Sequence, residues 1–194
     1  MKTRDNQHTE RPSYALMAGL VVAGLIGASG AAAKLAASQH AELKFVASQS
    51  DVPVAGEFKK FSADVDLDPA KPGAGKVNVV IDVASVDTGS ADADAMLKGK
   101  DFFDAAHYPQ ATFTSTTIVA NGNGKFRADG RFMMKGRNLA LAVPFTVRPE
   151  GGKLWFEGSV PVSRLAYKVG EGEWSDTGTL ADQVLIKFTL QVPR

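Results

Sequence analysis

The stretch KFRADGRFMMK, residues 125–135, decides the class of fold. Successive side chains of a β-strand point to opposite faces, so apolar residues at every second position predict a strand with one dry and one wet face. The run NGNG at 121–124 tolerates positive φ and predicts a hairpin turn just before this strand. The dry face is made by alternate residues of the stretch: Phe126, Ala128, Gly130, Phe132 and Met134.

The same alternation recurs along the chain, giving about eight strands at short spacing, which is typical of an antiparallel barrel or sandwich. Pro144 and Pro161 cannot donate to a ladder, so their strands are expected to lie at an edge or to carry bulges. The other runs are AELKFVA (41–47), FSADVDL (61–67), VNVVIDV (77–83), ATFTSTTIV (111–119), LALAVPFTV (139–147), LWFEGSVPV (154–162) and QVLIKFTLQV (183–192).

One segment, SADADAMLKG at 90–99, breaks the alternation. Ser90 is suited to cap a helix N-terminus, Asp92 and Asp94 lie in the first turns, and Gly99 is suited to stop the helix. The segment predicts a short helix followed by a turn.

The N-terminus carries a targeting signal. No charge occurs from Pro12 to Ala33, Lys2, Arg4 and Arg11 precede this stretch, and its apolar centre tapers into GASGAAA. This pattern is typical of a signal peptide over residues 1–33, although a retained membrane anchor is the alternative. Under both interpretations the domain is exported to the periplasm, with possible membrane association through residues 12–33. We expect a linker at 34–40 and a folded domain at 41–194.

Charge and cysteine content narrow the functional classes. Residues 34–194 carry equal numbers of basic and acidic side chains, whereas a nucleic-acid-binding domain would show a basic stripe. No cysteine is present, so neither a disulfide nor lipoprotein attachment is available. Stability must come from the core.

Local motifs give little support for a metal or catalytic site. His107 is the single histidine within the folded domain and is expected to lie at the surface. Asp64, Asp66 and Asp68 resemble the start of a calcium loop, but Pro69 and Gly75 replace residues that such a loop requires. We therefore expect no metal and no cofactor.

The dry face raises the question of function. All eleven phenylalanines follow residue 33, and six of them share the inward register. Barrels of this size are either filled by side chains or hold one small ligand, and the residues alone leave both possibilities open. Gly130 and Gly158 lie on the inward face, where a missing side chain leaves space, and Met96 and Met134 can adapt to an irregular ligand.

A long stretch, SVDTGSADADAMLKGKDFFDAAHYPQATFTSTTI at 85–118, resembles the signature of the YceI-like family of lipid- and polyisoprenoid-binding proteins. SRLAYKVGEGEWSDTGTLADQVLIKFTLQV at 163–192 is similar to the closing part of that family. The resemblance implies an exported, lipocalin-like antiparallel β-barrel that encloses a long isoprenoid chain. The matching residues are Val86, Thr88, Phe103, Asp104, Tyr108, Pro109, Phe113 and Ser115, then Arg164, Gly172, Glu173, Trp174 and Val184.

This sequence departs from the family pattern at Ala93, Met96, Met133 and Lys135, so the polar contacts to a ligand head group are expected to differ. Within the signature, Phe103 is expected to point into the lumen as part of an apolar plug. Phe102 is expected to pack between the turn and the barrel wall, and Asp104 to accept backbone N–H bonds.

The expected function is binding of a polyisoprenoid or quinone-type lipid, with no nucleic-acid partner and no catalysis. The first alternative is an exported stress or interaction module with a solid core. The second is an enzyme acting on a lipid through Asp94, Asp104, Lys135 or Arg164. The candidate ligand-binding residues are Phe45, Phe58, Val79, Ile81, Met96, Phe103, Phe113, Phe126, Phe132, Met134, Leu141, Phe145, Phe156, Trp174 and Phe188.

Overall fold

The computed structural model describes residues 33–36 and 41–193. Apart from Ala33, the signal peptide or anchor that we expect over residues 1–33 lies outside them. None of the helices in the described part of the chain has the length and apolar character needed to cross a membrane.

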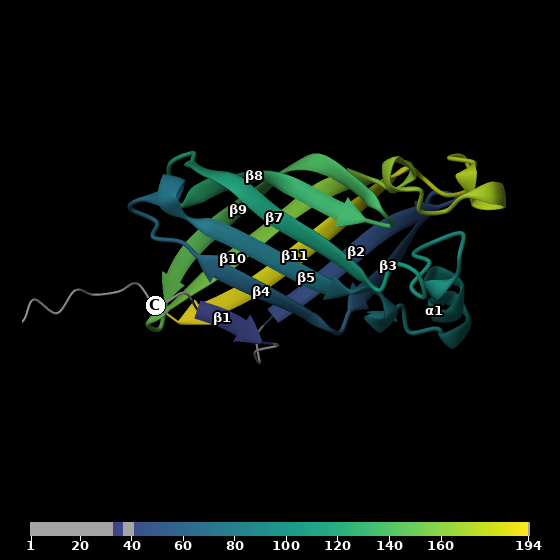
Figure 1. Cartoon of the computed structure of the whole chain (residues 1–194), viewed down its shortest axis with the longest axis horizontal. Coiled ribbons are helices and arrows are strands. Elements are labelled where there is room, and N and C mark those ends of the chain that lie inside the picture. Colours follow the sequence, from purple (N-terminus) through teal and green to yellow (C-terminus); the bar gives the residue numbers. More distant parts are fainter. Residues whose placement is uncertain (1–32, 37–40, 194) are drawn as a thin grey trace, which may run out of the picture.

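The described chain forms one curled, antiparallel sheet with a short helix at one end (Figure 1). The strand order is β1-β4-β5-β7-β8-β9-β10-β11-β2-β3-β6. The strands are β1 (Ala33–Ala36), β2 (Ala41–Gln49), β3 (Val52–Phe58), β4 (Phe61–Asp66), β5 (Lys76–Asp82), β6 (Val86–Asp87), β7 (Gln110–Ala120), β8 (Lys125–Met134), β9 (Arg137–Glu150), β10 (Lys153–Ser163) and β11 (Gln183–Pro193).

The all-β antiparallel fold and the short helix are confirmed, and each of the eight predicted runs forms a strand. The count of about eight is too low, because β1, β3 and β6 complete an 11-stranded sheet. β1 lies partly in the stretch expected to be a linker. The sheet also has two ends, β1 and β6, so its ladder does not run around a full circle. β1 pairs with β4 and lies near β11, which brings the two sides of the curl together at that end.

The helix α1 (Ala91–Lys98) begins as expected, because the Ser90 hydroxyl accepts a hydrogen bond from the backbone N–H of Ala93 at 3.4 Å. It ends at Gly99. Short 3-10 helices occupy Pro72–Ala74, Val83–Ser85, Leu165–Tyr167 and Gly172–Ser175. Figure 1 places α1 and the segment 164–182 at the same end of the sheet, where the backbone N–H of Gly170 donates to the carbonyl of Asp101 at 2.8 Å.

The two prolines correct the expectation of edge strands, since β9 and β10 are both interior in the strand order. Their mutual ladder, however, ends at the pair Phe145 and Gly158. Beyond it, β9 pairs with β8 alone and β10 with β11 alone. Pro144 and Pro161 both lie where β9 and β10 no longer pair with each other. Each strand is bonded on one side only there, so a missing donor costs least.

Candidate functional site

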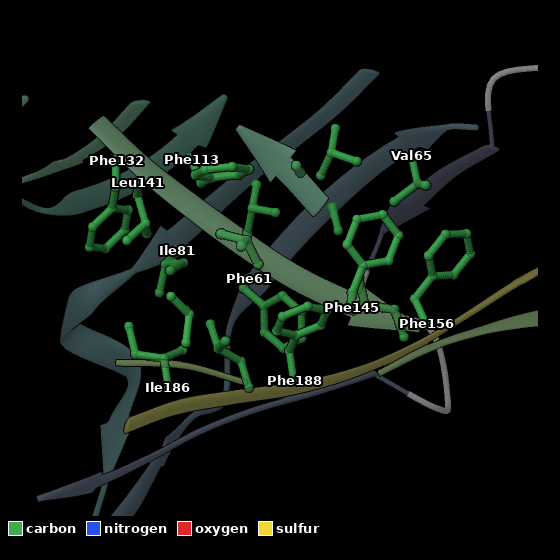
Figure 2. Close-up of a pocket in the computed structure, with 18 residues that line it drawn as sticks. Phe61, Val65, Ile81, Phe113, Phe132, Leu141, Phe145, Phe156, Ile186 and Phe188 are labelled. Carbon is green, nitrogen blue, oxygen red and sulfur yellow. The ribbon is translucent and has the colours of Figure 1, made fainter. Parts of the chain in front are cut away.

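A first cavity, cavity 1, lies inside the curled sheet (Figure 2). Its empty volume is about 800 Å³, which includes space open to solvent. Every side chain that lines it is a hydrocarbon, contributed by strands on opposite sides of the curl. Such a lining offers no hydrogen bond, so the cavity suits an apolar ligand.

The inward side chains show that this interior is not filled. Val79, Leu141, Val143 and Phe188 line cavity 1 but are only half-buried. In a close-packed core such residues would be almost fully buried, as Val83 is with an exposed fraction of 2%. The phenylalanine-rich interior is therefore hollow.

One group of rings packs beside cavity 1. Phe145 stacks on Phe126 with ring centroids 5.5 Å apart and approaches Phe156 at 6.1 Å. Phe145 and Phe156 line the cavity, whereas Phe126 does not. Phe126 is absent from the lining and stacks on the lining ring of Phe145, and its role in ligand binding stays a prediction.

A second cavity, cavity 2, lies at the end of the sheet that carries α1. Its empty volume is about 1040 Å³, again including space open to solvent. Phe45, Phe58 and Phe103 form a chain of rings along it, with successive centroids 5.7 Å apart. Phe132 and Ile186 line both cavities, so the two cavities are neighbours at these residues.

Cavity 2 differs from cavity 1 by having polar groups in its lining. Gln49, Thr88, Arg164 and Tyr167 all contribute. Burial raises the pKa of the Tyr167 phenol and lowers the pKa of the Arg164 guanidinium. A raised pKa keeps the phenol neutral at neutral pH, and an arginine guanidinium stays charged in proteins. Cavity 2 can therefore accept a more polar part of a ligand than cavity 1 can.

Arg164 and Lys135 hold the loops around cavity 2 together. The Arg164 guanidinium donates to the carbonyl oxygens of Val169, Gly170, Leu180 and Ala181 at 2.6–3.0 Å. These bonds fix the segment that follows β10. Asp182, which lies near the guanidinium, accepts hydrogen bonds from Ser163 and Leu165.

Lys135 occupies the two-residue turn between β8 and β9, with φ +47°. Its buried ammonium donates to the carbonyl oxygens of Lys100 at 2.8 Å and Lys168 at 2.7 Å, and to the carboxylate of Glu171 at 3.1 Å. A side chain with this many fixed partners acts as a structural tie between the turn after α1 and the segment after β10.

In the turn after α1, Asp104 accepts backbone N–H bonds as expected, but through its carbonyl and not its carboxylate. The Asp104 carboxylate pairs with the imidazole of exposed His107 at 2.8 Å. It is the backbone carbonyl of Asp104 that meets backbone donors, from His107 and Tyr108. His107 lies at the surface, as expected.

The two adjacent phenylalanines of this turn are both buried and both line cavity 2. Phe103 packs against Phe58 of β3, in keeping with an apolar plug. Phe102 instead packs on Trp174, with ring centroids 5.5 Å apart. This contact joins the turn to the segment after β10, and the expected packing of Phe102 against the barrel wall stays a prediction.

The inward glycines correct another expectation. A Cβ built at Gly158 would lie 2.5 Å from the Phe188 ring, and one at Gly130 would lie 2.8 Å from the Phe113 ring. The space above both glycines is therefore occupied, by these phenyl rings together with the carbonyl oxygens of Thr114 and Pro144. Gly56, below the ring of Phe45, repeats the arrangement.

Fourteen of the fifteen candidate residues line one of the two cavities, Phe126 being the exception. Their role in ligand binding stays a prediction. Val79, Ile81, Phe113, Leu141, Phe145, Phe156 and Phe188 line cavity 1, Phe45, Phe58, Met96, Phe103, Met134 and Trp174 line cavity 2, and Phe132 lines both.

Some lining residues were missed. Phe61 and Ile186 share the inward register of their strands, so the alternation could have found them. Val54 lines cavity 2 from β3, a strand that the sequence did not predict, and Val169 and Leu180 line it from irregular segments, where no periodic signal exists.

The four residues considered for catalysis do not share one site. Asp94 accepts hydrogen bonds from Thr88, Asp104 pairs with His107, and Lys135 binds loop carbonyls. Of the four, Arg164 alone lines a cavity. Each is engaged in a contact that supports local structure.

Three comparisons bear on this architecture. A UPF0312 protein of Shewanella baltica (strain OS185) is 38% identical over 117 residues, which is 60% of this chain and 61% of that protein. The chain thus spans about three fifths of the length of the curated relatives it matches. The crystal structure of Burkholderia cenocepacia BcnA is 44% identical, with a TM-score of 0.77, and the match covers 79% of this chain and 96% of that one.

A domain from Saccharophagus degradans, described as a polyisoprenoid binding domain implicated in plant cell wall breakdown, is 17% identical. Its TM-score is 0.62 over 79% of this chain and 93% of that one, and at this identity the likeness shows the fold alone. The YceI-like domain model matches residues 35–192, nearly the whole described sheet. The chain belongs to the YceI-like family.

Proposed function

We propose that this chain binds an elongated isoprenoid lipid of the quinone or polyprenyl type and sequesters or carries it in the periplasm. The observation that carries the proposal is that two largely apolar cavities lie next to each other, with Phe132 and Ile186 in the lining of both. A hydrocarbon chain would occupy cavity 1, and a ring or weakly polar head would lie in cavity 2 beside Tyr167 and Arg164.

The driving force is the removal of the chain from water, at about 0.8 kcal/mol for each buried CH₂ before ordering costs. Cavity 1 offers no polar partner, so a ligand rich in hydroxyl or charged groups would lose hydrogen bonds on entering it. Membership of the YceI-like family supports the proposal. So does the fold shared with a domain described as polyisoprenoid-binding.

The first test uses the full chain purified from cells in mild detergent. Native mass spectrometry is expected to show one lipid per chain, and organic extraction should release a prenyl lipid. The chain freed of lipid by refolding should then take up geranylgeraniol and decylubiquinone, with palmitic acid as the straight-chain comparison. An empty chain that takes up neither prenyl compound would refute the proposal.

Trp174 provides an internal reporter because its ring lines cavity 2, whereas Trp155, the other tryptophan, lines neither cavity. Binding of decylubiquinone should quench tryptophan fluorescence, and Trp174→Phe should remove most of the quenching while leaving the bound mass unchanged. Quenching that persists in Trp174→Phe would place the quinone elsewhere.

Export is part of the proposal and is tested separately. Cell fractionation should recover the chain outside the cytoplasm, either free or attached to the inner membrane through residues 12–33. Recovery in the cytoplasm would contradict the periplasmic role without affecting lipid binding.

A further inference from the structure

We propose that the lipid enters and leaves cavity 2 through an opening between β3 and α1, at Val54 and Met96. The inference rests on the proposed function and names the route by which that site exchanges its ligand. Both residues line cavity 2, and they are 37% and 40% exposed. They therefore lie where the apolar lining reaches the surface of the molecule.

The β3 side of this opening is a sheet edge. β3 pairs with β2 from Val52 to Glu57, but β6 covers only Glu57 and Phe58 on the other side. Residues 52–55 are all exposed. No strand in the described sheet lies beyond this part of β3, so a ligand passing there breaks no ladder.

The α1 side has little buried surface, although the carbonyls of Leu97 and Lys98 in its last turn accept hydrogen bonds from the backbone N–H groups of Phe103 and Ala105. None of the eight residues of α1 is buried, although Ala93, Met96 and Leu97 line cavity 2. Glycines flank the helix, with Gly89 at φ +81° before it and Gly99 after it. A short helix with little buried surface and glycine at both ends can move as a lid at small cost.

One contact holds the start of this lid. The Asp94 carboxylate accepts hydrogen bonds from the backbone N–H and the hydroxyl of Thr88, at 2.8 and 2.7 Å. Thr88 itself lines cavity 2. The contact closes the helix onto the chain that leaves β6, so its loss should loosen the lid.

The alternative route, between the turn after α1 and the segment after β10, is closed by many contacts. Lys135 and Arg164 bind carbonyls on these segments, and the carbonyl of Asp101 accepts from both Gly170 and Glu171. The ring contact of Phe102 with Trp174 adds apolar packing. Opening there would break several buried hydrogen bonds together.

The test measures exchange rates by stopped flow in the full chain, using N-phenyl-1-naphthylamine, whose emission rises in an apolar cavity, with geranylgeraniol as competitor. The double variant Val54→Trp/Met96→Trp narrows the opening. An obstruction of the passage slows both association and dissociation, so both rates should fall at least fivefold.

The chain offers a matched control. Val119 and Met133 are 37% and 42% exposed and line neither cavity. Val119→Trp/Met133→Trp should exchange the probe at the rate of the unmodified chain. Equal rates in the two double variants, within twofold, would overturn the proposed opening.

A second variant tests the lid without adding bulky side chains at the opening. Asp94→Ala removes the Thr88 contact and should raise both rates at least threefold, whereas Asp92→Ala, in the same helical turn, should change neither. Rates unchanged or lowered in Asp94→Ala would overturn the lid. Failure of the unmodified chain to bind both probe and geranylgeraniol would instead refute lipid binding itself.

Discussion

A substitution of valine by phenylalanine should stabilise the protein at one position and destabilise it at another. Val79 lines cavity 1 and is half-buried, while Val83, four residues later, is 2% exposed and lines neither cavity. At Val79 the larger ring has empty space to enter. At Val83 it must displace packed neighbours.

The magnitudes follow from area and packing. The ring adds roughly 60 Å² of apolar surface, and burying it at about 25 cal/mol per Å² is worth about 1.5 kcal/mol. Lost side-chain freedom reduces the net gain for Val79→Phe to about 1 kcal/mol. Val83→Phe should cost about 1–3 kcal/mol, the usual penalty for overpacking.

The assay is chemical and thermal unfolding of the lipid-free chain, followed by titration with geranylgeraniol. Val79→Phe should raise Tm by roughly 2–4 °C and weaken lipid binding at least tenfold, because the ring occupies the ligand's space. Val83→Phe should lower Tm and leave the affinity of the folded fraction unchanged. If Val79→Phe lowers stability as Val83→Phe does, the interior is filled and the argument from a hollow core fails.

Three further predictions concern other parts of the molecule. Lys135→Met removes three hydrogen bonds and should lower the unfolding free energy, measured by urea denaturation, by about 3 kcal/mol. The control Lys125→Met, at an exposed position, should leave it close to unchanged. A loss below about 1 kcal/mol in Lys135→Met would contradict the role of a structural tie. Gly158→Ala should displace the Phe188 ring and lower both Tm and lipid affinity, because its Cβ would lie 2.5 Å from that ring; unchanged Tm and affinity would show that the ring is not seated there. N-terminal sequencing of the mature chain should find cleavage near Ala33, and an intact Met1 would show that residues 12–33 are retained as an anchor.

Strands with one dry and one wet face were predictable from the sequence because a two-residue period is imposed by strand geometry itself. The run at 125–135 became β8 (Lys125–Met134), with Phe126, Ala128, Gly130, Phe132 and Met134 all buried. The helix was predictable because its cap, acidic first turn and terminal glycine agree with one another. Local chemistry sufficed in both cases.

The strands that were missed carry no such signal. β6 is two residues long, and β3 contains Pro53 and Gly56, both unfavourable in strand interiors. β3 forms by pairing with β2, and β6 forms by pairing with the end of β3, so both depend on a neighbouring strand and not on local sequence. The ties made by Lys135 and Arg164 were likewise hidden, since their acceptors are backbone carbonyls, which leave no trace in residue identity.

Whether the interior is hollow or filled depends on where the phenyl rings lie. The glycines paired with them across the strands decide these positions. Gly158 pairs across strands with Phe188, and Gly56 pairs with Phe45. In each pair the ring covers the glycine, a position that any Cβ would block. The glycines therefore leave no empty space of their own, but they set where two lining rings lie, that of Phe188 in cavity 1 and that of Phe45 in cavity 2.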